Sequence, residues 1–182
     1  YLEQASSTRL EFKEETISLI GEGKIDLGGI AKGYCLDKIK SYLDENKISS
    51  YRISGGSSSI LLGKTGSSDK PNFTLSFRDY PSIGYQTREC GVSTSSISEQ
   101  RYEVGGVTYS HIVNAKTGSA KPSYQAISLI GNPQTEFPNA YMDAMSTAFF
   151  SYEEEDIIRV CQESDLRYLI VTLEEKAITD LN

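Results

Sequence analysis

The sequence contains few of the residues that metal clusters and disulfide frameworks require. Among its 182 residues are one histidine, three cysteines and no tryptophan. Cys35, Cys90 and Cys161 are odd in number and widely spaced, so they match neither a zinc pattern nor a complete set of disulfides. We expect these thiols to be buried or inert.

Positive charge is also scarce. There are 18 lysines and arginines against 25 aspartates and glutamates, which gives a formal net charge of -7, and no basic stretch occurs. Nucleic acid is not an expected partner, because binding it requires clustered basic residues that neutralise phosphates. A dinucleotide ligand remains compatible with this balance if a metal ion or a few local groups offset its phosphates.

Long hydrophobic runs are absent as well. None approaches the roughly 20 residues that cross a bilayer, and no signal peptide is recognised at Tyr1. Because the first residue is not methionine, we expect upstream sequence to have been removed or left out. Hydrophobic residues make up 38% and charged residues 24%, which is typical of a globular protein, and the length fits one domain over residues 1–182.

Hydrophobic periodicity predicts an α+β domain with a mixed, mostly antiparallel sheet and two or three covering helices. Helical spacing begins at Ile30 and recurs from Pro138 to Phe150 and from Glu153 to Cys161. Strand patterns are expected at 9–20, 24–27, 48–54, 73–77, 124–130, 169–173 and 177–179, with a hairpin turn at Gly105-Gly106. Ser54–Ser57 and Val92–Ser96 are predicted to be small polar turns, which either wrap a ligand or are plain loops.

The first candidate motif is the segment from Asp26 to Tyr34. A predicted strand ends in a carboxylate, two glycines follow, and a helix starts. Helix N-termini suit phosphates because they present free N–H groups and partial positive charge. Lys32 in the first turn is unfavourable there unless an anion is nearby. The alternative is an ordinary strand-to-helix turn with a solvated lysine.

The second candidate is the segment from His111 to Gly118. His111 is the single histidine, and its near-neutral pKa range suits a general acid or base. The polar turn that contains Thr117 is able to approach a ligand. The alternative is a lone histidine at the end of a strand.

The third candidate lies in the helix predicted from Pro138. Asp143 and Thr147 are four residues apart and therefore share one helix face. Their oxygens are hard ligands of the kind that Mg²⁺ binds together with waters and substrate phosphates. A capping or ion-pairing role is the alternative.

In order and spacing, these motifs resemble the FAD:protein FMN transferases, the ApbE-like family once called thiamine biosynthesis lipoproteins. The resemblance covers residues 24 to 150, and it includes Asp37 after the first motif, the Gly55-Gly56 turn and the Val92–Ser96 turn. It implies a single ApbE-like domain over 1–182 that corresponds to the C-terminal two-thirds of the family fold. The N-terminal third, with its Met-Gly-Thr-like stretch, has no counterpart in this sequence.

The resemblance implies a Mg²⁺-dependent enzyme that cleaves the pyrophosphate of FAD. FMN is then attached to a threonine hydroxyl of an acceptor flavoprotein, and AMP leaves. The residues carried over by motif are Asp143, Thr147 and the carbonyl of Gly29 for the metal, Asp26 and Lys32 for FAD, His111 as the base, and Thr117 and Ser95 near the flavin phosphate.

The sequence departs from the family pattern in ways that bear on activity. Ala115 stands where the family usually has proline, and Ser95-Ser96 replaces a common Ser-Gly. Because the N-terminal third is lacking, we expect an incomplete FAD site and weak or no activity in this chain alone. Two other functions stay open: a Mg²⁺-dependent pyrophosphatase that splits FAD into FMN and AMP, and a noncatalytic flavin-binding module.

The resemblance also bears on location. Family members are often exported lipoproteins or periplasmic proteins that act on membrane-associated electron-transfer proteins. It therefore implies an extracytoplasmic location, with membrane contact only through a lipid anchor that this chain does not contain.

Overall fold

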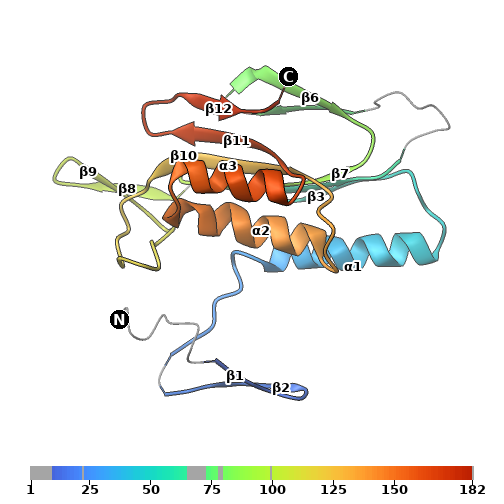
Figure 1. The fold of residues 1–182 in the computed structure, drawn as a ribbon, viewed down its shortest axis with the longest axis horizontal. Helices are drawn as coiled ribbons and strands as arrows, with labels where there is room; N and C mark the ends of the chain where they lie inside the picture. Colours follow the sequence, from blue (N-terminus) through green and yellow to red (C-terminus); the bar gives the residue numbers. More distant parts are fainter. Residues whose placement is uncertain (1–9, 22, 65–72, 78–79, 99, 182) are drawn as a thin grey trace.

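A six-stranded antiparallel sheet forms the centre of the protein. The structure is a computed structural model that describes residues 10–21, 23–64, 73–77, 80–98 and 100–181. Neighbouring strands in the sheet follow the order β12-β11-β10-β7-β4-β3. Their bounds are β3 Arg52–Gly55, β4 Ser59–Leu62, β7 Cys90–Ser96, β10 Tyr124–Gly131, β11 Arg167–Thr172 and β12 Ala177–Thr179. Figure 1 shows these strands above the helices at residues 31–45 and 138–148.

Besides this sheet, the described residues form three helices and three separate two-stranded hairpins. The helices are α1 Ala31–Glu45, α2 Pro138–Ala148 and α3 Glu154–Glu163, and a 3-10 turn, η3 Phe149–Ser151, follows α2. The hairpins are β1 Leu10–Lys13 with β2 Thr16–Leu19, β5 Phe73–Phe77 with β6 Tyr80–Thr87, and β8 Arg101–Val104 with β9 Val107–Ser110. None of the helices in the described ranges is long and apolar enough to cross a membrane. The arrangement confirms the predicted α+β fold.

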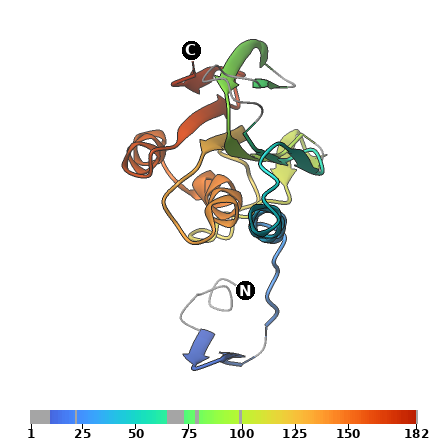
Figure 2. The ribbon, with the colours of Figure 1, turned by 90° about the vertical axis from the view of Figure 1, so that its right-hand side faces the viewer.

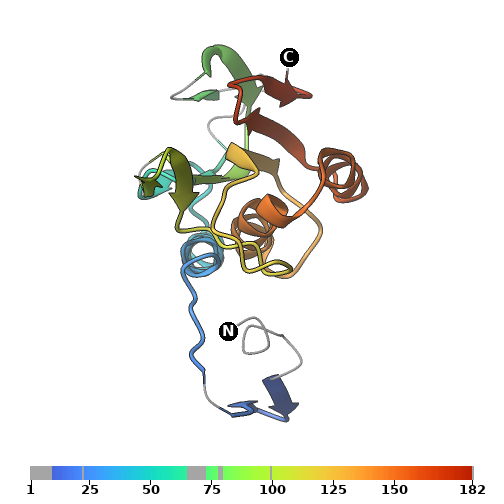
Figure 3. The ribbon, with the colours of Figure 1, turned by 90° about the vertical axis from the view of Figure 1, so that its left-hand side faces the viewer.

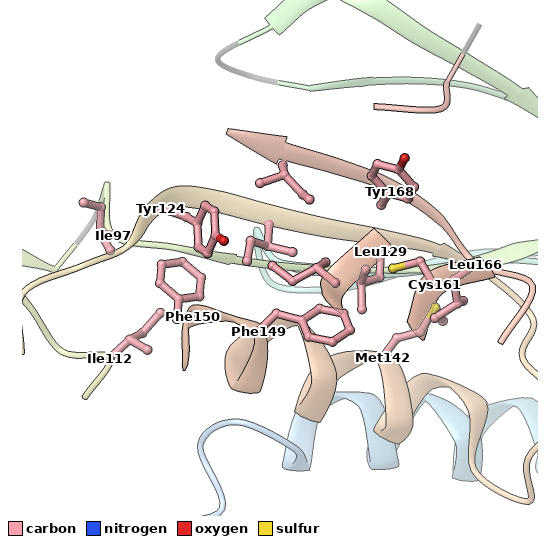
Figure 4. Packing of buried hydrophobic residues seen from close by; sticks show 13 residues of the cluster. Ile97, Ile112, Tyr124, Leu129, Met142, Phe149, Phe150, Cys161, Leu166 and Tyr168 are labelled. Carbon is pink, nitrogen blue, oxygen red and sulfur yellow. The ribbon is translucent and has the colours of Figure 1, made fainter. Parts of the chain in front are cut away.

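The two faces of the sheet bury two different hydrophobic clusters. Successive side chains of a strand point to opposite faces, so Ile127 and Leu129 of β10 face α2 and α3, where they pack with Phe149 and Ile157. Figure 4 shows this cluster between the sheet and the helices. The opposite face belongs to a second cluster, in which Ile130 and residues of β11 pack against the β5–β6 hairpin. Figures 2 and 3 show this hairpin on the side of the sheet away from α1 and α2.

Two sequence predictions about strands were wrong. Val92–Ser96 is not a turn but part of β7, which pairs with β4 on one side and β10 on the other. Pairing on both edges outweighs the low strand preference of its serines. Lys24–Leu27 is extended but forms no strand, since no described strand lies beside it, and Leu27 is 60% exposed.

The β1–β2 hairpin lies apart from the sheet and helices. Its register pairs Leu10 with Leu19, and both strands lie in the range where the alternation predicted strand. Figures 2 and 3 both show it joined to the rest by an extended segment. Phe12 is 72% exposed, so this hairpin contributes little to the described core.

Helices α1 and α2 are joined through the carboxylate of Asp37. This side chain of α1 is 5% exposed. Its Oδ1 accepts hydrogen bonds from the backbone N–H of Asn139 at 3.0 Å and from the Asn139 side-chain amide at 2.7 Å, and its Oδ2 accepts from Ala140 N–H at 2.8 Å. These backbone donors lie in the first turn of α2, where Phe137 at the N-cap supplies no side-chain acceptor. Asp37 therefore caps α2 from the neighbouring helix.

Gly33 allows the close approach that this cap requires. A Cβ added to Gly33 would lie 2.2 Å from the carbonyl oxygen of Asn139. No side chain fits at that distance without moving one helix. The contact fixes α2 against the first turns of α1.

We predict that Asp37→Ala lowers the free energy of unfolding by at least about 3 kcal/mol, because three buried donors lose a charged acceptor. Urea denaturation measures this loss. The matched control is Asp44→Ala on the same helix, where an exposed carboxylate pairs with Lys40. That change should cost under about 1 kcal/mol. Equal effects of the two substitutions would contradict the capping role.

The cysteines divide into two buried thiols and one exposed thiol. Cys90 and Cys161 are buried, as expected, whereas Cys35 is exposed on α1. Burial raises the pKa of the Cys90 thiol to about 11 and that of Cys161 to about 12. At neutral pH both thiols are almost entirely protonated and unreactive.

We predict that the folded chain at pH 8 reacts with one equivalent of an aromatic disulfide reagent, at Cys35, since the other two thiols lack both access and thiolate. Absorbance of the released thiolate counts the reactive groups. Cys35→Ser should abolish the fast reaction. Fast modification of Cys90 or Cys161 without denaturant would show that the described packing is wrong.

Candidate functional site

The start of α1 is shaped by a short loop that begins at Asp26. Asp26 Oδ1 accepts a hydrogen bond from the N–H of Gly28 at 2.6 Å, and Lys32 Nζ donates to the Gly28 carbonyl at 3.3 Å. An aspartate that bonds the backbone two residues ahead stabilises a tight turn. Asp26 and Lys32 are thus both attached to the Gly28-Gly29 turn, and both are exposed.

Asp143 is the buried charge at the centre of the site. Its side chain on α2 is 3% exposed. Oδ2 accepts a hydrogen bond from the N–H of Gly33 at 3.0 Å, and Oδ1 accepts from the hydroxyl of Ser93 on β7, also at 3.0 Å. Lys32 Nζ lies 4.0 Å from Oδ1. A buried carboxylate needs such partners, because an isolated buried charge is very costly.

A cluster of hydroxyl groups lies beside this carboxylate. Ser95 Oγ is 2.8 Å from Thr147 Oγ1 and 2.9 Å from Ser146 Oγ. Thr147 Oγ1 also donates to the backbone carbonyl of Asp143 at 3.3 Å. A Cβ added to Gly29 would lie 3.4 Å from Thr147 Oγ1, which places the Gly29 backbone against this hydroxyl. The fold therefore brings together the three residues proposed to hold a metal, Gly29, Asp143 and Thr147.

The chemistry of these donors fits Mg²⁺. A carboxylate, hydroxyl groups and a backbone carbonyl are all hard oxygen ligands. Asp143 is nearly inaccessible, and Lys32 Nζ lies 4.0 Å from its carboxylate, which is the limit of an ion pair. Lys32 therefore neutralises the buried negative charge of Asp143 only in part, and a bound cation would stabilise that charge further. The described residues contain no group of three or more histidine, cysteine, aspartate or glutamate side chains that could enclose a metal. Such a sparse protein ligand set suits an ion that keeps waters and substrate phosphates.

His111 lies at the end of the β8–β9 hairpin and is exposed. Its Nδ1 is 3.3 Å from the carbonyl of Gln100, and its backbone N–H donates to the same carbonyl at 3.4 Å. Within the described residues, no hydrogen bond to Nε2 is found. The imidazole is therefore anchored through Nδ1 on an exposed side chain.

Asn114 organises the loop that follows. Its Oδ1 accepts hydrogen bonds from Lys116 N–H at 2.9 Å and Thr117 N–H at 3.1 Å. Gly118, with φ of +71°, donates a hydrogen bond from its N–H to the Asn114 carbonyl at 2.7 Å. The Thr117 hydroxyl accepts from Ser119 N–H at 3.2 Å. Ala115 takes part in none of these bonds, so the turn forms without the proline that the family usually has there.

One large cavity joins these groups. Its volume is about 1030 Å³, at the upper end of the usual range of ligand sites. Seven of the eight predicted site residues line it: Asp26, Gly29, Lys32, Ser95, His111, Asp143 and Thr147. The eighth, Thr117, is not among its lining residues. We call this space the site cavity.

Sequence reasoning missed residues that hold the site together. Ser93 and Ser146 were not singled out, although they bond Asp143 and Ser95 respectively. Strand alternation would have placed Ser93 and Ser95 on one face, but the segment was interpreted as a turn. Asp37 was noted after the first motif, without a role.

Comparison with known proteins gives relatives of one kind. A FAD:protein FMN transferase from Treponema pallidum is 29% identical over 149 residues, which are 74% of this chain and 40% of that protein. A second FAD:protein FMN transferase, from Rhodobacter capsulatus, is 26% identical over 160 residues, or 85% of this chain and 29% of that protein. This chain therefore spans less than half the length of either relative.

Solved structures show the same fold. The ApbE protein of Thermotoga maritima superposes with a TM-score of 0.83 at 21% identity, over 98% of this chain and 59% of that chain. The flavinyl transferase ApbE of Pseudomonas stutzeri, in its apo form, gives 0.76 at 18% identity, over 99% and 56%. The model of the ApbE family matches residues 2–170. The chain belongs to the ApbE family.

Proposed function

We propose that this chain carries the metal-binding and FAD-binding part of a Mg²⁺-dependent transferase, which moves FMN from FAD to a threonine hydroxyl of an acceptor flavoprotein and releases AMP. One observation supports this most: Asp143, Thr147 and Gly29 lie together in a cavity that also contains Lys32 and His111. The relatives named above are FAD:protein FMN transferases.

The charges in the cavity suit the diphosphate of FAD. Lys32 Nζ extends along the first turn of α1, where the helix dipole adds partial positive charge. Asp143, Thr147 and the Gly29 carbonyl would hold Mg²⁺ beside these phosphates. When bound, the ion would polarise a phosphoryl oxygen and offset the charge of the leaving AMP.

The transfer requires one bond to form and one to break. The acceptor threonine oxygen attacks the phosphorus of the FMN half, while the anhydride bond to the AMP phosphate breaks. His111 takes the hydroxyl proton, for which its exposed imidazole is suited. The remaining protein groups act by positioning and charge stabilisation, as phosphoryl transfer generally requires.

The relatives extend well beyond the part that this chain matches. We therefore propose that full affinity for FAD also needs residues outside the matched region, and that this chain alone is weakly active or inactive. An extracytoplasmic location is likewise proposed from family membership alone.

We predict that FAD binds more tightly with Mg²⁺ than with a chelator, and that Asp143→Asn removes this difference by weakening Mg²⁺-dependent affinity about tenfold or more. The reason is the loss of the buried carboxylate that would bind Mg²⁺. Flavin fluorescence titration measures it. The control is Asp156→Asn, an exposed carboxylate on α3 paired with Arg159, which should change nothing.

Other results would identify another function. FAD affinity that is equal with and without Mg²⁺, in the wild type and in Asp143→Asn, would support a noncatalytic flavin-binding module. Release of FMN and AMP without any covalent adduct on an acceptor would support a pyrophosphatase.

We predict that His111→Ala slows covalent transfer by about 10²- to 10⁴-fold, the usual contribution of a general base, while FAD affinity stays within about twofold. The enzyme in this assay is the longest polypeptide that contains this chain. Flavin that stays on the acceptor protein after denaturing electrophoresis measures the transfer. Lys121→Ala, at an exposed position outside the cavity lining, is the control. Transfer at the wild-type rate in His111→Ala would exclude His111 as the base.

A further inference from the structure

A second, smaller cavity of about 140 Å³ lies between the central sheet and the β5–β6 hairpin. Its walls are mainly apolar and come from both sides, with Ile60, Val92, Leu169 and Val171 on the sheet and Leu75 and Phe77 on the hairpin. We call it the side cavity. The chemistry proposed above does not use it.

The side cavity lies on the opposite face of the sheet from Asp143. Along β7, Ser93 and Ser95 bond side chains of α2, whereas Val92 and Thr94 line the side cavity. The Thr94 hydroxyl is 2.8 Å from the Ser128 hydroxyl, so these two groups share a hydrogen bond within the wall. Most of the accessible wall is apolar.

The two cavities meet at a common rim. Ser57, Ser58, Thr94 and Ser96 line both. These residues lie at the β3–β4 turn and along the C-terminal half of β7. A ligand that crosses this rim places one group in the side cavity and another in the site cavity.

The size and polarity of the side cavity limit which chemical group can enter it. An apolar cavity of about 150 Å³ holds one benzene molecule. The side cavity, at about 140 Å³, is thus large enough for one ring or a branched aliphatic side chain. It is too small for a three-ring flavin, and its apolar walls disfavour a charged diphosphate.

We propose that the side cavity binds an apolar side chain of the acceptor flavoprotein, close in sequence to the threonine that receives FMN. This inference rests on the proposed transferase function and adds to it a determinant of acceptor specificity. The acceptor segment crosses the serine-lined rim, with its apolar side chain in the side cavity and its threonine hydroxyl in the site cavity.

The first test changes the volume of the side cavity. Ala126 on β10 lines it, so Ala126→Leu fills part of the space. The matched control is Ala177→Leu, which alters a half-buried alanine of the same hydrophobic cluster that is not a lining residue. The probes are fluorescent threonine peptides that carry leucine at successive positions around the threonine, each paired with an alanine version.

We expect at least one leucine peptide to bind the wild type about tenfold or more tightly than its alanine version, a typical preference of an apolar pocket. Ala126→Leu should abolish that preference, and Ala177→Leu should keep it. FAD affinity should stay within about twofold in both variants. No leucine preference in the wild type, or a preference that survives Ala126→Leu, would overturn the proposal.

A second measurement tests the cavity itself. Toluene titrated into the labelled chain should shift the methyl resonances of Leu75, Leu169 and Val171 in the wild type but not in Ala126→Leu. Absence of a shift in the wild type would contradict the proposal. So would an Ala126→Leu variant in which the affinity for FAD falls while the preference for leucine peptides stays unchanged. Peptide binding does not require turnover. A leucine preference in this chain, together with no adduct on an acceptor from the full-length protein, would refute the transferase function and leave the side cavity intact.

Discussion

Two buried carboxylates join α1 to α2, and the geometry of the whole site depends on this pair. Asp37 of α1 accepts hydrogen bonds from the first turn of α2, and Asp143 of α2 accepts one from the first turn of α1. Each helix thus directs N-terminal N–H groups, with their partial positive charge, at an acid of the other. Gly33 lets the helices approach closely enough for both contacts. These contacts fix the position of α1 along α2.

This arrangement of the two helices places the oxygens of Asp143 and Thr147 at the cavity in which Mg²⁺ is proposed to bind. β7 approaches α2 from the sheet, and its Ser93 and Ser95 complete the surroundings of Asp143 and Thr147. These groups are held by hydrogen bonds before any ligand arrives, which reduces the reorganisation that a charged ligand must cause. His111 and Lys32 are exposed and line the same cavity as these hydrogen-bonded groups.

The sequence predicted the parts that depend on local periodicity. The helix from Pro138, the buried strand from Tyr124 and the shared face of Asp143 and Thr147 follow from spacing alone. Contacts between distant segments did not. The bond between Gly33 and Asp143 joins residues 110 apart, and no local pattern encodes it. Strand β7 was missed because its serines resemble a turn, and only its two neighbours make it a strand.

Location of a bound metal tests the central claim most directly. Mn²⁺ substitutes for Mg²⁺ and can be identified by its anomalous scattering in crystals grown with FAD. We predict one strong peak within about 2.3 Å of oxygen atoms of Asp143, Thr147 and Gly29, with the FAD phosphates on its open side. A peak elsewhere, or FAD bound in the site cavity with Lys32 against Asp143 and no metal between, would contradict it.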